Sequence, residues 1–193
     1  MFVPSINPMK VREVLSDEWV GKEVSLRGWV YRHRTGSNMV FMVLRDSTDI
    51  IQCIVRRDNP HFEEAKDLYI ESSVKIDGIL KKDERAPTGY EVEVKGLKVI
   101  HRGEPFPIGK DQSTEFLLDV RHLWLRSMRL TRIMEARHYI VKHLRDFLDK
   151  EGFYEVPAPL ITKSGAEGGS EVFEIDYFGE RAYLTQSSQL YAE

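Results

Sequence analysis

Five segments between residues 23 and 100 alternate apolar and polar side chains, and this period most constrains the fold. The segments are EVSLRGWVYR from Glu23, MVFMVLRD from Met39, IIQCIVRR from Ile50, SSVKIDGILKK from Ser72 and YEVEVKGLKVI from Tyr90. A period of two predicts strands with one buried face. The turn-forming sequences RTGSN, DSTD and DERAPTG separate them. The first half of the chain is therefore predicted to be β-rich.

One helical segment interrupts this series, between the third strand and the fourth. In NPHFEEAKDLY, from Asn59 to Tyr69, acidic residues occupy the first turn, and Phe62, Ala65 and Leu68 have helical spacing. Five strands with a helix after the third is the order of an OB-fold, a small barrel that commonly binds single-stranded nucleic acid. The sequence therefore predicts an OB-fold.

One face of this barrel has the side chains for nucleic-acid binding. Alternation places Phe41 and Gln52 on the outer face beside Arg27, Arg32, Arg34 and Arg45. An aromatic ring can stack on an unpaired base, an amide can read its edge, and arginines can hold phosphates. A phenylalanine in a β-strand is usually part of the core, however, and arginines on a small barrel are usually a solvated surface, so spacing alone does not decide for nucleic-acid binding.

After the fifth strand the chain changes character. The run HRGEPFPIGKDQS, from His101 to Ser113, has two prolines and two glycines and is predicted to be a linker. Apolar residues at helical spacing then predict an amphipathic helix from Arg129 to Lys150, ended by Gly152. In FYEVPAPLI, Pro157 and Pro159 lack backbone donors, which predicts an edge or interface strand.

Composition limits the class of protein. The chain has 193 residues, a net charge of −3 and a single cysteine, Cys53, so it has no internal disulfide and no global attraction to nucleic acid. Cys53 lies in the apolar string IIQCIV and is expected to be buried rather than reactive. No apolar run is long enough to span a bilayer or serve as a signal peptide. We expect a cytoplasmic protein that does not bind membranes.

The last thirty residues combine features of a ligand site. A glycine-rich loop with Glu167 at its centre can close over a cationic group, although such a loop is more often a surface turn. The sequence DYFGERAYL predicts a hairpin around Phe178 to Glu180. If the following TQSSQLYAE turns helical, Ser187, Gln189 and Glu193 can converge on one pocket.

These motifs together resemble the class IIb aminoacyl-tRNA synthetases. The resemblance lies in GWVYR, LRDSTDIIQ, LLDVRHLWLRS, FLDKEGFYEVPAPL, EGGSEVFEIDYF and LTQSSQLYAE, and it covers the chain from about Lys10. It implies an α+β protein: an OB-fold anticodon-binding domain over residues 1–105, a hinge over 106–128, and the start of an antiparallel α/β class II catalytic domain over 129–193.

The resemblance also implies residue roles. In the barrel, Phe41 would stack on the middle anticodon base, Gln52 would read a base edge, Arg27 and Arg34 would contact the RNA, and Glu93 or Glu91 would lie near the first anticodon base. In the second part, Ile133, Ile140 and Pro159 would lie in a homodimer interface. Glu167 would meet the α-ammonium group of the amino acid, and Ser187 and Gln189 would line its pocket.

The same resemblance implies asparagine as the amino acid. Aspartate-specific members typically have a lysine at the position of Ala192 and a proline at that of Ser188. Without that lysine a substrate carboxylate stays unpaired, which costs on the order of a few kcal/mol. The partners would be asparagine, ATP with Mg²⁺, and tRNA(Asn). The alternatives are an aspartate-specific enzyme and a non-catalytic tRNA-binding or dimerisation module.

The resemblance places the arginines that hold ATP phosphates in two further motifs, which this sequence does not contain, so no catalytic residue and no metal ligand are assigned to it. We predict that the purified 193-residue chain does not catalyse asparagine-dependent ATP–pyrophosphate exchange. Exchange above the rate without asparagine, measured with labelled pyrophosphate, would contradict this prediction.

Overall fold

The computed structural model describes residues 7–163 and 172–192, and these divide into two units between Phe116 and Leu117. The predicted boundary lay earlier, at residue 105. The first unit contains β1 (Glu23–Thr35), β2 (Met39–Arg45), β3 (Ile50–Arg56), α2 (Phe62–Lys66), β4 (Ser73–Lys82) and β5 (Tyr90–His101). Five strands with a helix after the third is the order that the alternation predicted.

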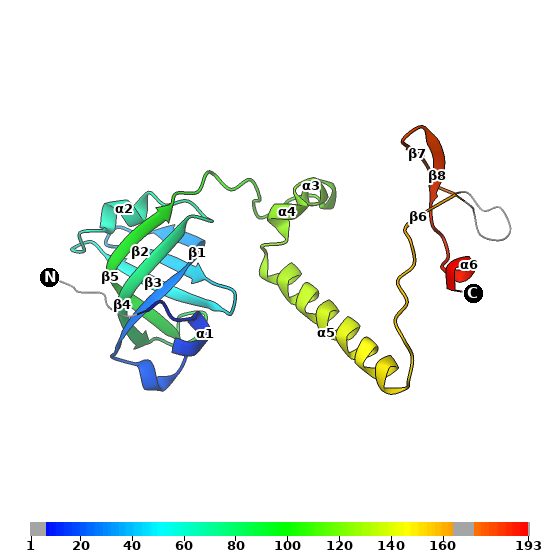
Figure 1. The fold of residues 1–193 in the computed structure, drawn as a ribbon. Coiled ribbons are helices and arrows are strands. Elements are labelled where there is room, and N and C mark those ends of the chain that lie inside the picture. The colour runs from blue at the N-terminus through cyan, green and yellow to red at the C-terminus, as the bar shows by residue number, and fades with distance from the viewer. Residues whose placement is uncertain (1–6, 164–171, 193) are drawn as a thin grey trace. The chain divides into compact units, whose positions relative to one another are not determined.

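The five strands close into a barrel in the order β1-β2-β3-β5-β4 (Figure 1). All neighbouring pairs are antiparallel except β3 and β5, which run parallel. The first half of β1 pairs with β4 and the second half with β2, with a register shift between Val30 and Arg32. Closure removes the free strand edges that an open sheet would expose. The predicted OB-fold is confirmed.

The barrel interior is filled by the inward residues of the alternating strands. The fully buried side chains include Leu26, Met42, Leu44, Ile51, Ile76 and Leu80. Cys53 is also completely buried, and burial raises the pKa of its thiol to about 12. The thiol is therefore protonated at neutral pH and serves as a small apolar core group, as the sequence predicted.

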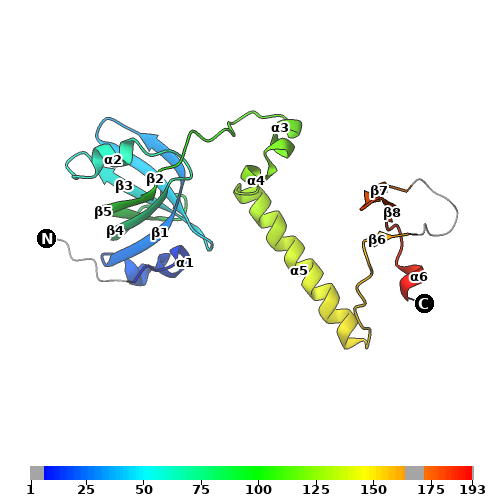
Figure 2. The same cartoon turned by 45° about the horizontal axis from the view of Figure 1, so that its top comes forward.

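Two short elements before β1, which the sequence analysis did not identify, complete this unit. They are α1 (Val11–Val14) and η1 (Asp17–Trp19), and α1 lies against the barrel in both ribbon views (Figures 1 and 2). Val11 and Val14 are fully buried, and the backbone N–H of Val11 donates to Asp46 Oδ2 at 2.9 Å. The N-terminal segment is thereby fastened to the turn between β2 and β3.

The second unit contains α4 (Arg121–Trp124), α5 (Met128–Lys150), β6 (Ile161–Thr162), β7 (Glu174–Tyr177), β8 (Glu180–Leu184) and α6 (Gln189–Ala192); α3 (Thr114–Asp119) spans the division between the units. Both α3 and α4 fall inside the stretch predicted as a hinge. Helix α5 matches its predicted range within one residue. Its N-cap is Ser127, whose Oγ accepts from the N–H of Leu130 at 3.4 Å. Gly152 at φ 86° ends it, as predicted.

The hairpin after α5 is confirmed, whereas the strand predicted for FYEVPAPLI is wrong. Strands β7 and β8 pair antiparallel around Phe178 and Gly179, and β6 pairs with β8 on its other side. Residues 153–160 form no strand, and β6 is limited to Ile161–Thr162. Pro157 and Pro159 cannot donate to a ladder, which explains why pairing begins only after them.

Close approach of β4 and β5 gives a test of the barrel. A Cβ at Gly78 would lie 2.4 Å from Glu93 O and 2.6 Å from Val92 Cγ1, whereas one at Gly96 would lie 3.6 Å from the nearest atom, Asp77 Cβ. We predict that Gly78→Ala lowers the free energy of unfolding by roughly 1–3 kcal/mol, because the strands must separate. Urea denaturation should show a much smaller change for the control Gly96→Ala, and equal effects would contradict the prediction.

Candidate nucleic-acid interface

The outer face of β2, β3 and β5 holds four of the residues that the sequence singled out for RNA, namely Phe41, Gln52, Glu91 and Glu93. In β2, buried Val40, Met42 and Leu44 alternate with Phe41, which is half-buried. In β3, buried Ile51 and Cys53 flank Gln52, which is also half-buried. Phe41 and Gln52 therefore lie on the outer surface of the barrel, as the alternation predicted.

Phe41 and Arg34 form a cation–π pair. They are direct partners in the β1–β2 register, and the Arg34 guanidinium carbon lies 4.8 Å from the centre of the Phe41 ring. Such a pair at an exposed site contributes only about 0.5–1 kcal/mol, so another planar group can compete for the ring. The pair places an aromatic surface and a positive charge side by side, which is the combination that stacks a base and holds its phosphate.

Gln52 is bonded to Glu91 on the neighbouring strand. The two residues are partners in the parallel β3–β5 register, and Gln52 Nε2 donates to Glu91 Oε2 at 2.9 Å. Both side chains are half-buried. Gln52 therefore has a defined hydrogen-bond partner within the protein.

The other predicted carboxylate, Glu93, is paired with two lysines. Its oxygens accept from Lys81 Nζ and from Lys95 Nζ, the latter at 2.6 Å. These hydrogen bonds, chiefly that from Lys81, lower the pKa of Glu93 from 4.5 to about 2, although partial burial opposes the shift. Glu93 is therefore ionised and held by cations at neutral pH.

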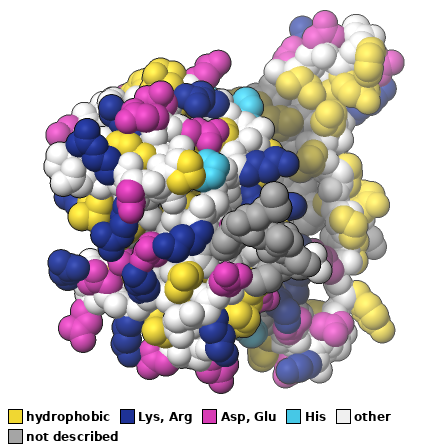
Figure 3. Space-filling model, turned by 90° about the vertical axis from the view of Figure 1, so that its left-hand side faces the viewer, with side chains coloured by type: hydrophobic (Ala, Val, Ile, Leu, Met, Phe, Trp, Pro, Cys, Tyr) yellow, Lys and Arg dark blue, Asp and Glu magenta, His cyan; other side chains and the backbone are white. Residues whose placement is uncertain are grey.

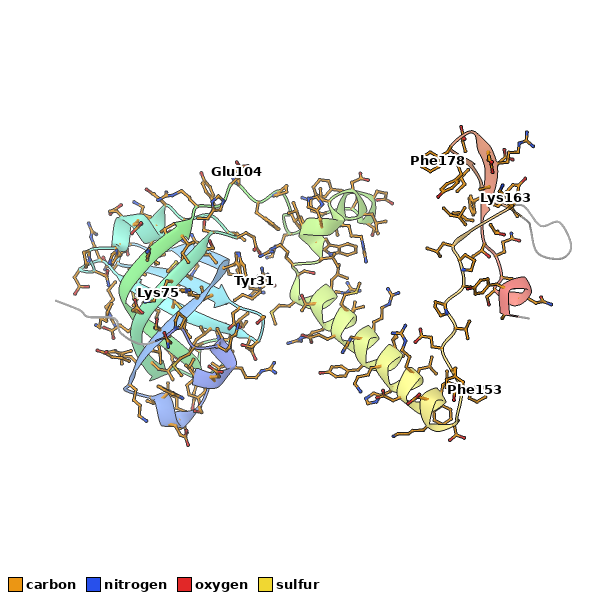
Figure 4. The ribbon with its side chains drawn as sticks, viewed as in Figure 1. Tyr31, Lys75, Glu104, Phe153, Lys163 and Phe178 are labelled. Carbon is orange, nitrogen blue, oxygen red and sulfur yellow. The ribbon has the colours of Figure 1, made fainter. Side chains whose placement is uncertain are left out.

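The structure does not bring the remaining arginines to Phe41. Arg27 lies on the half of β1 before the register shift, where its backbone register partner is Lys75 of β4. Arg45 forms a salt bridge with Glu71 at 2.8 Å, and its guanidinium carbon lies 5.0 Å from the ring centre of Tyr31. Figure 4 labels Tyr31 on the barrel. Arg32 lies over the same ring at 5.5 Å. Arg32 and Arg45 therefore share the Tyr31 ring, whereas Arg27 lies on the other half of β1 from Arg34.

Tyr31 and Glu71 were not identified from the sequence. Glu71 adopts a positive φ of 67°, a conformation that no residue pattern indicated. Tyr31 follows the buried Val30 at the register shift, which alternation cannot locate. The barrel face shown in Figure 3 carries basic and acidic side chains intermixed rather than one positive patch.

The described residues that the sequence assigned to an amino-acid pocket lie in the second unit. Ser187, Gln189 and Ala192 are exposed, and Ser187 Oγ accepts from the N–H of Gln189 at 3.1 Å, just before α6. The turn from strand to helix that the sequence predicted is therefore present. Glu167 and Glu193 lie outside the described residues. Within residues 7–163 and 172–192, no group of three His, Cys, Asp or Glu side chains could hold a metal ion.

The residues assigned to a subunit interface are exposed in the second unit. Ile133 and Ile140 are 47% and 68% exposed, and Pro159 is also exposed. Phe153, which follows α5, and Phe178, at the hairpin tip, are likewise exposed (Figure 4). Among the described residues of this unit, only Leu130 and Ala182 are buried hydrophobics. No helix in the described part of the chain has the length and apolarity needed to cross a membrane.

Ionisation of Glu93 gives a pH-dependent prediction. A carboxyl group whose pKa is lowered on folding stabilises the folded state above its unfolded pKa, and that stability is lost as the pH falls through the folded pKa. Glu93→Gln should therefore lower the free energy of unfolding at neutral pH, with the difference from wild type shrinking between pH 4.5 and about 2. Urea denaturation at several pH values across this range measures the difference in free energy of unfolding. Glu104→Gln, a change at an exposed residue, is the control. A difference that does not depend on pH would contradict this role.

Comparison with known protein families matches both units. The family model of the OB-fold nucleic acid binding domain matches residues 24–100, and that of the class II tRNA synthetases (D, K and N) matches residues 113–193. The asparagine–tRNA ligase of Thermoplasma acidophilum is 45% identical over 188 residues, which are 96% of this chain and 44% of that protein. The chain thus spans less than half the length of this relative.

Solved structures give the same picture. An asparaginyl-tRNA synthetase from Pyrococcus horikoshii, complexed with asparaginyl-adenylate, superposes with a TM-score of 0.84 at 41% identity, over 96% of this chain and 44% of that one. A putative aspartyl-tRNA synthetase from Leishmania major Friedlin superposes with a TM-score of 0.81 at 25% identity, over 98% of this chain and 40% of that one. The fold is shared by both groups, and the sequence is more similar to the asparaginyl structure.

Proposed function

Because this chain corresponds in sequence and fold to the N-terminal portion of the asparagine–tRNA ligases, we propose that it is the anticodon-binding and amino-acid-binding part of such an enzyme. The whole enzyme would use ATP to activate asparagine and would transfer it to tRNA(Asn). The observation that carries this proposal is the outer face of the barrel, where Arg34 and Phe41 form a stacking site beside the Gln52–Glu91 pair.

The anticodon is the part of tRNA that such a face suits. Anticodon bases are unpaired and can leave the loop to stack on an aromatic side chain. Phe41 supplies the stacking surface, Gln52 supplies a hydrogen-bonding edge, and Arg34 supplies a positive charge next to the Phe41 ring. Because phosphates are present in every RNA, specificity would come from Gln52 and affinity from Phe41 and Arg34.

Selection of asparagine over aspartate rests on α6. Ala192 lies in this helix, where its methyl group offers no charge to a substrate carboxylate. Asparagine has a neutral amide in place of that carboxylate and is not penalised. Glu167 would then meet the α-ammonium group, with Ser187 and Gln189 beside it.

ATP and Mg²⁺ are the cofactors of the proposed reaction. They would supply the phosphoryl group that activates the amino acid and a neutralising positive charge. Among residues 7–163 and 172–192, no group of three His, Cys, Asp or Glu side chains fits a metal ion. We also propose that the enzyme works in the cytoplasm and that α5 joins two copies of it. The exposed Ile133 and Ile140 on α5, together with Pro159, support this dimer because a stable association would bury them.

Removal of the stacking ring tests the proposed function. Phe41→Ala should weaken binding of a tRNA(Asn) anticodon stem-loop by ~1 to 3 kcal/mol, because the base loses its stacking surface. Fluorescence anisotropy with a labelled stem-loop measures this effect. Tyr69→Ala, which removes an exposed barrel aromatic outside β2, β3 and β5, is the matched control. Equal binding by wild type and Phe41→Ala would refute an anticodon site at Phe41.

A further inference from the structure

The outer face of β1, β4 and β5 carries a row of cations that takes no part in the stacking site. We propose that this row, Arg27, Lys75 and Lys98, is a second RNA-binding surface, which holds phosphates without reading bases. Arg27 is the register partner of Lys75, and Lys75 is the register partner of Lys98. Strand β4 lies between β1 and β5 in the closed barrel, whereas Phe41 lies on β2. The inference therefore stands apart from the proposed function, because it needs no base on Phe41.

All three cations lie on the outer surface of the barrel. Lys75 lies between Val74 and Ile76, which are completely buried, so strand alternation turns it outward. Arg27 and Lys98 each follow a buried leucine and are exposed. Direct partners on neighbouring antiparallel strands have Cβ atoms roughly 4.5–5.5 Å apart. The row is therefore a continuous line of positive charge across three strands.

Little negative charge balances this row. Asp77 Oδ1 lies 3.2 Å from Lys75 Nζ, and Asp77 is the one acidic residue among the described residues of this row and of the two rows beside it. Those two rows are Trp29, Ser73, His101 and Ser25, Asp77, Gly96.

The outer two cations of the row have no counter-charge of their own. Neither Arg27 nor Lys98 has a salt bridge or a side-chain hydrogen bond with the described part of the chain. Like charges placed directly opposite in an antiparallel pair oppose folding. Arg27 and Lys98 therefore gain their counter-charge from a ligand rather than from the fold.

Trp29 indicates the chemical class of that ligand. It lies two residues from Arg27 on the same face of β1, and it is 42% exposed. An indole ring can stack on any nucleobase, while neighbouring cations hold the phosphates. An acidic peptide would pair with the cations but would offer the ring no base. The combination favours RNA, and because every RNA has phosphates and stacking bases, binding would not depend on sequence.

The test isolates this surface from the stacking site by using Phe41→Ala as the parent chain. A labelled oligouridylate of about twelve nucleotides, within the length that one OB-fold covers, is titrated by fluorescence anisotropy at several salt concentrations. Changing Arg27→Gln and Lys98→Gln together should weaken binding by on the order of tenfold at low salt. The slope of log affinity against log salt should fall by roughly 1.4, because each phosphate contact to a single strand contributes about 0.7.

Lys22→Gln with Lys66→Gln is the matched control, since it removes the same charge from exposed residues outside β1, β4 and β5. An equal loss of affinity in this control, or no binding by the parent chain, would overturn the inference. Binding of a tRNA(Asn) stem-loop through Phe41 is measured with the unmodified chain, so either proposal can fail without the other.

Urea denaturation separates a ligand site from a structural role. Because Arg27 and Lys98 repel Lys75, the double variant should unfold at the same urea concentration as its parent or at a higher one. A row that served the fold would instead make the variant less stable. A lower urea midpoint together with weaker binding would therefore overturn the inference.

A second probe separates RNA from an acidic peptide. In the same parent, Trp29→Ala should weaken binding of the oligouridylate by roughly fivefold or more, because a base loses its stacking surface. Binding of an oligoglutamate of equal charge should not change. If Trp29→Ala affects neither probe and both bind equally well, the row is a site for acidic peptides and its assignment to RNA is wrong.

Discussion

Closure of the barrel through β1 is the constraint on which the functional face depends. This strand has 13 residues, and it pairs with β4 over its first half and with β2 over its second. The register shift at Val30 and Arg32 lets one strand serve both partners, because a bulge bends and twists the strand that contains it. Past the shift, the register places Arg34 opposite Phe41. The Arg34–Phe41 pair is thus a consequence of how the barrel closes.

The face is preorganised by pairs of side chains across neighbouring strands. Arg34 lies over Phe41, Glu91 holds Gln52, and Glu93 is held between Lys81 and Lys95. Each pair limits the rotamers of a side chain that would otherwise lose freedom on binding RNA, which lowers the entropic cost of recognition. The pairs also neutralise charge locally, so the face can be specific without a large positive potential. This agrees with the chain's net charge of −3.

The sequence predicted the strands of the barrel but not the way they meet. Alternation identified all five strands and the outward direction of Phe41 and Gln52, because a period of two follows from strand geometry alone. It grouped Arg27 with Phe41, since both point outward, whereas the register places Arg27 against Lys75. It also could not separate Glu91 from Glu93, which share one face of β5. That distinction depends on the parallel pairing of β3 with β5, a long-range contact without a local signal. The prolines of FYEVPAPLI predicted an edge or interface strand, but residues 153–160 form no strand, because two missing donors so close together leave too few backbone groups for a ladder.

The two units differ in what stabilises them. The barrel buries its own core, so the face proposed to bind RNA is supported by packing within the first unit. Helix α5 instead depends on local interactions, among them the Ser127 cap, the Lys142–Asp146 pair at 2.6 Å and the turn at Gly152. Such contacts contribute a few tenths to about one kcal/mol each, which is marginal for a helix with one buried side chain among its described residues. Burial of the exposed apolar stripe of α5, which includes Ile133 and Ile140, would stabilise the helix more than these contacts do, because burial of apolar surface contributes about 25 cal/mol per Å². Association through that stripe would therefore order the second unit and the amino-acid site together, while anticodon reading could proceed on the barrel alone.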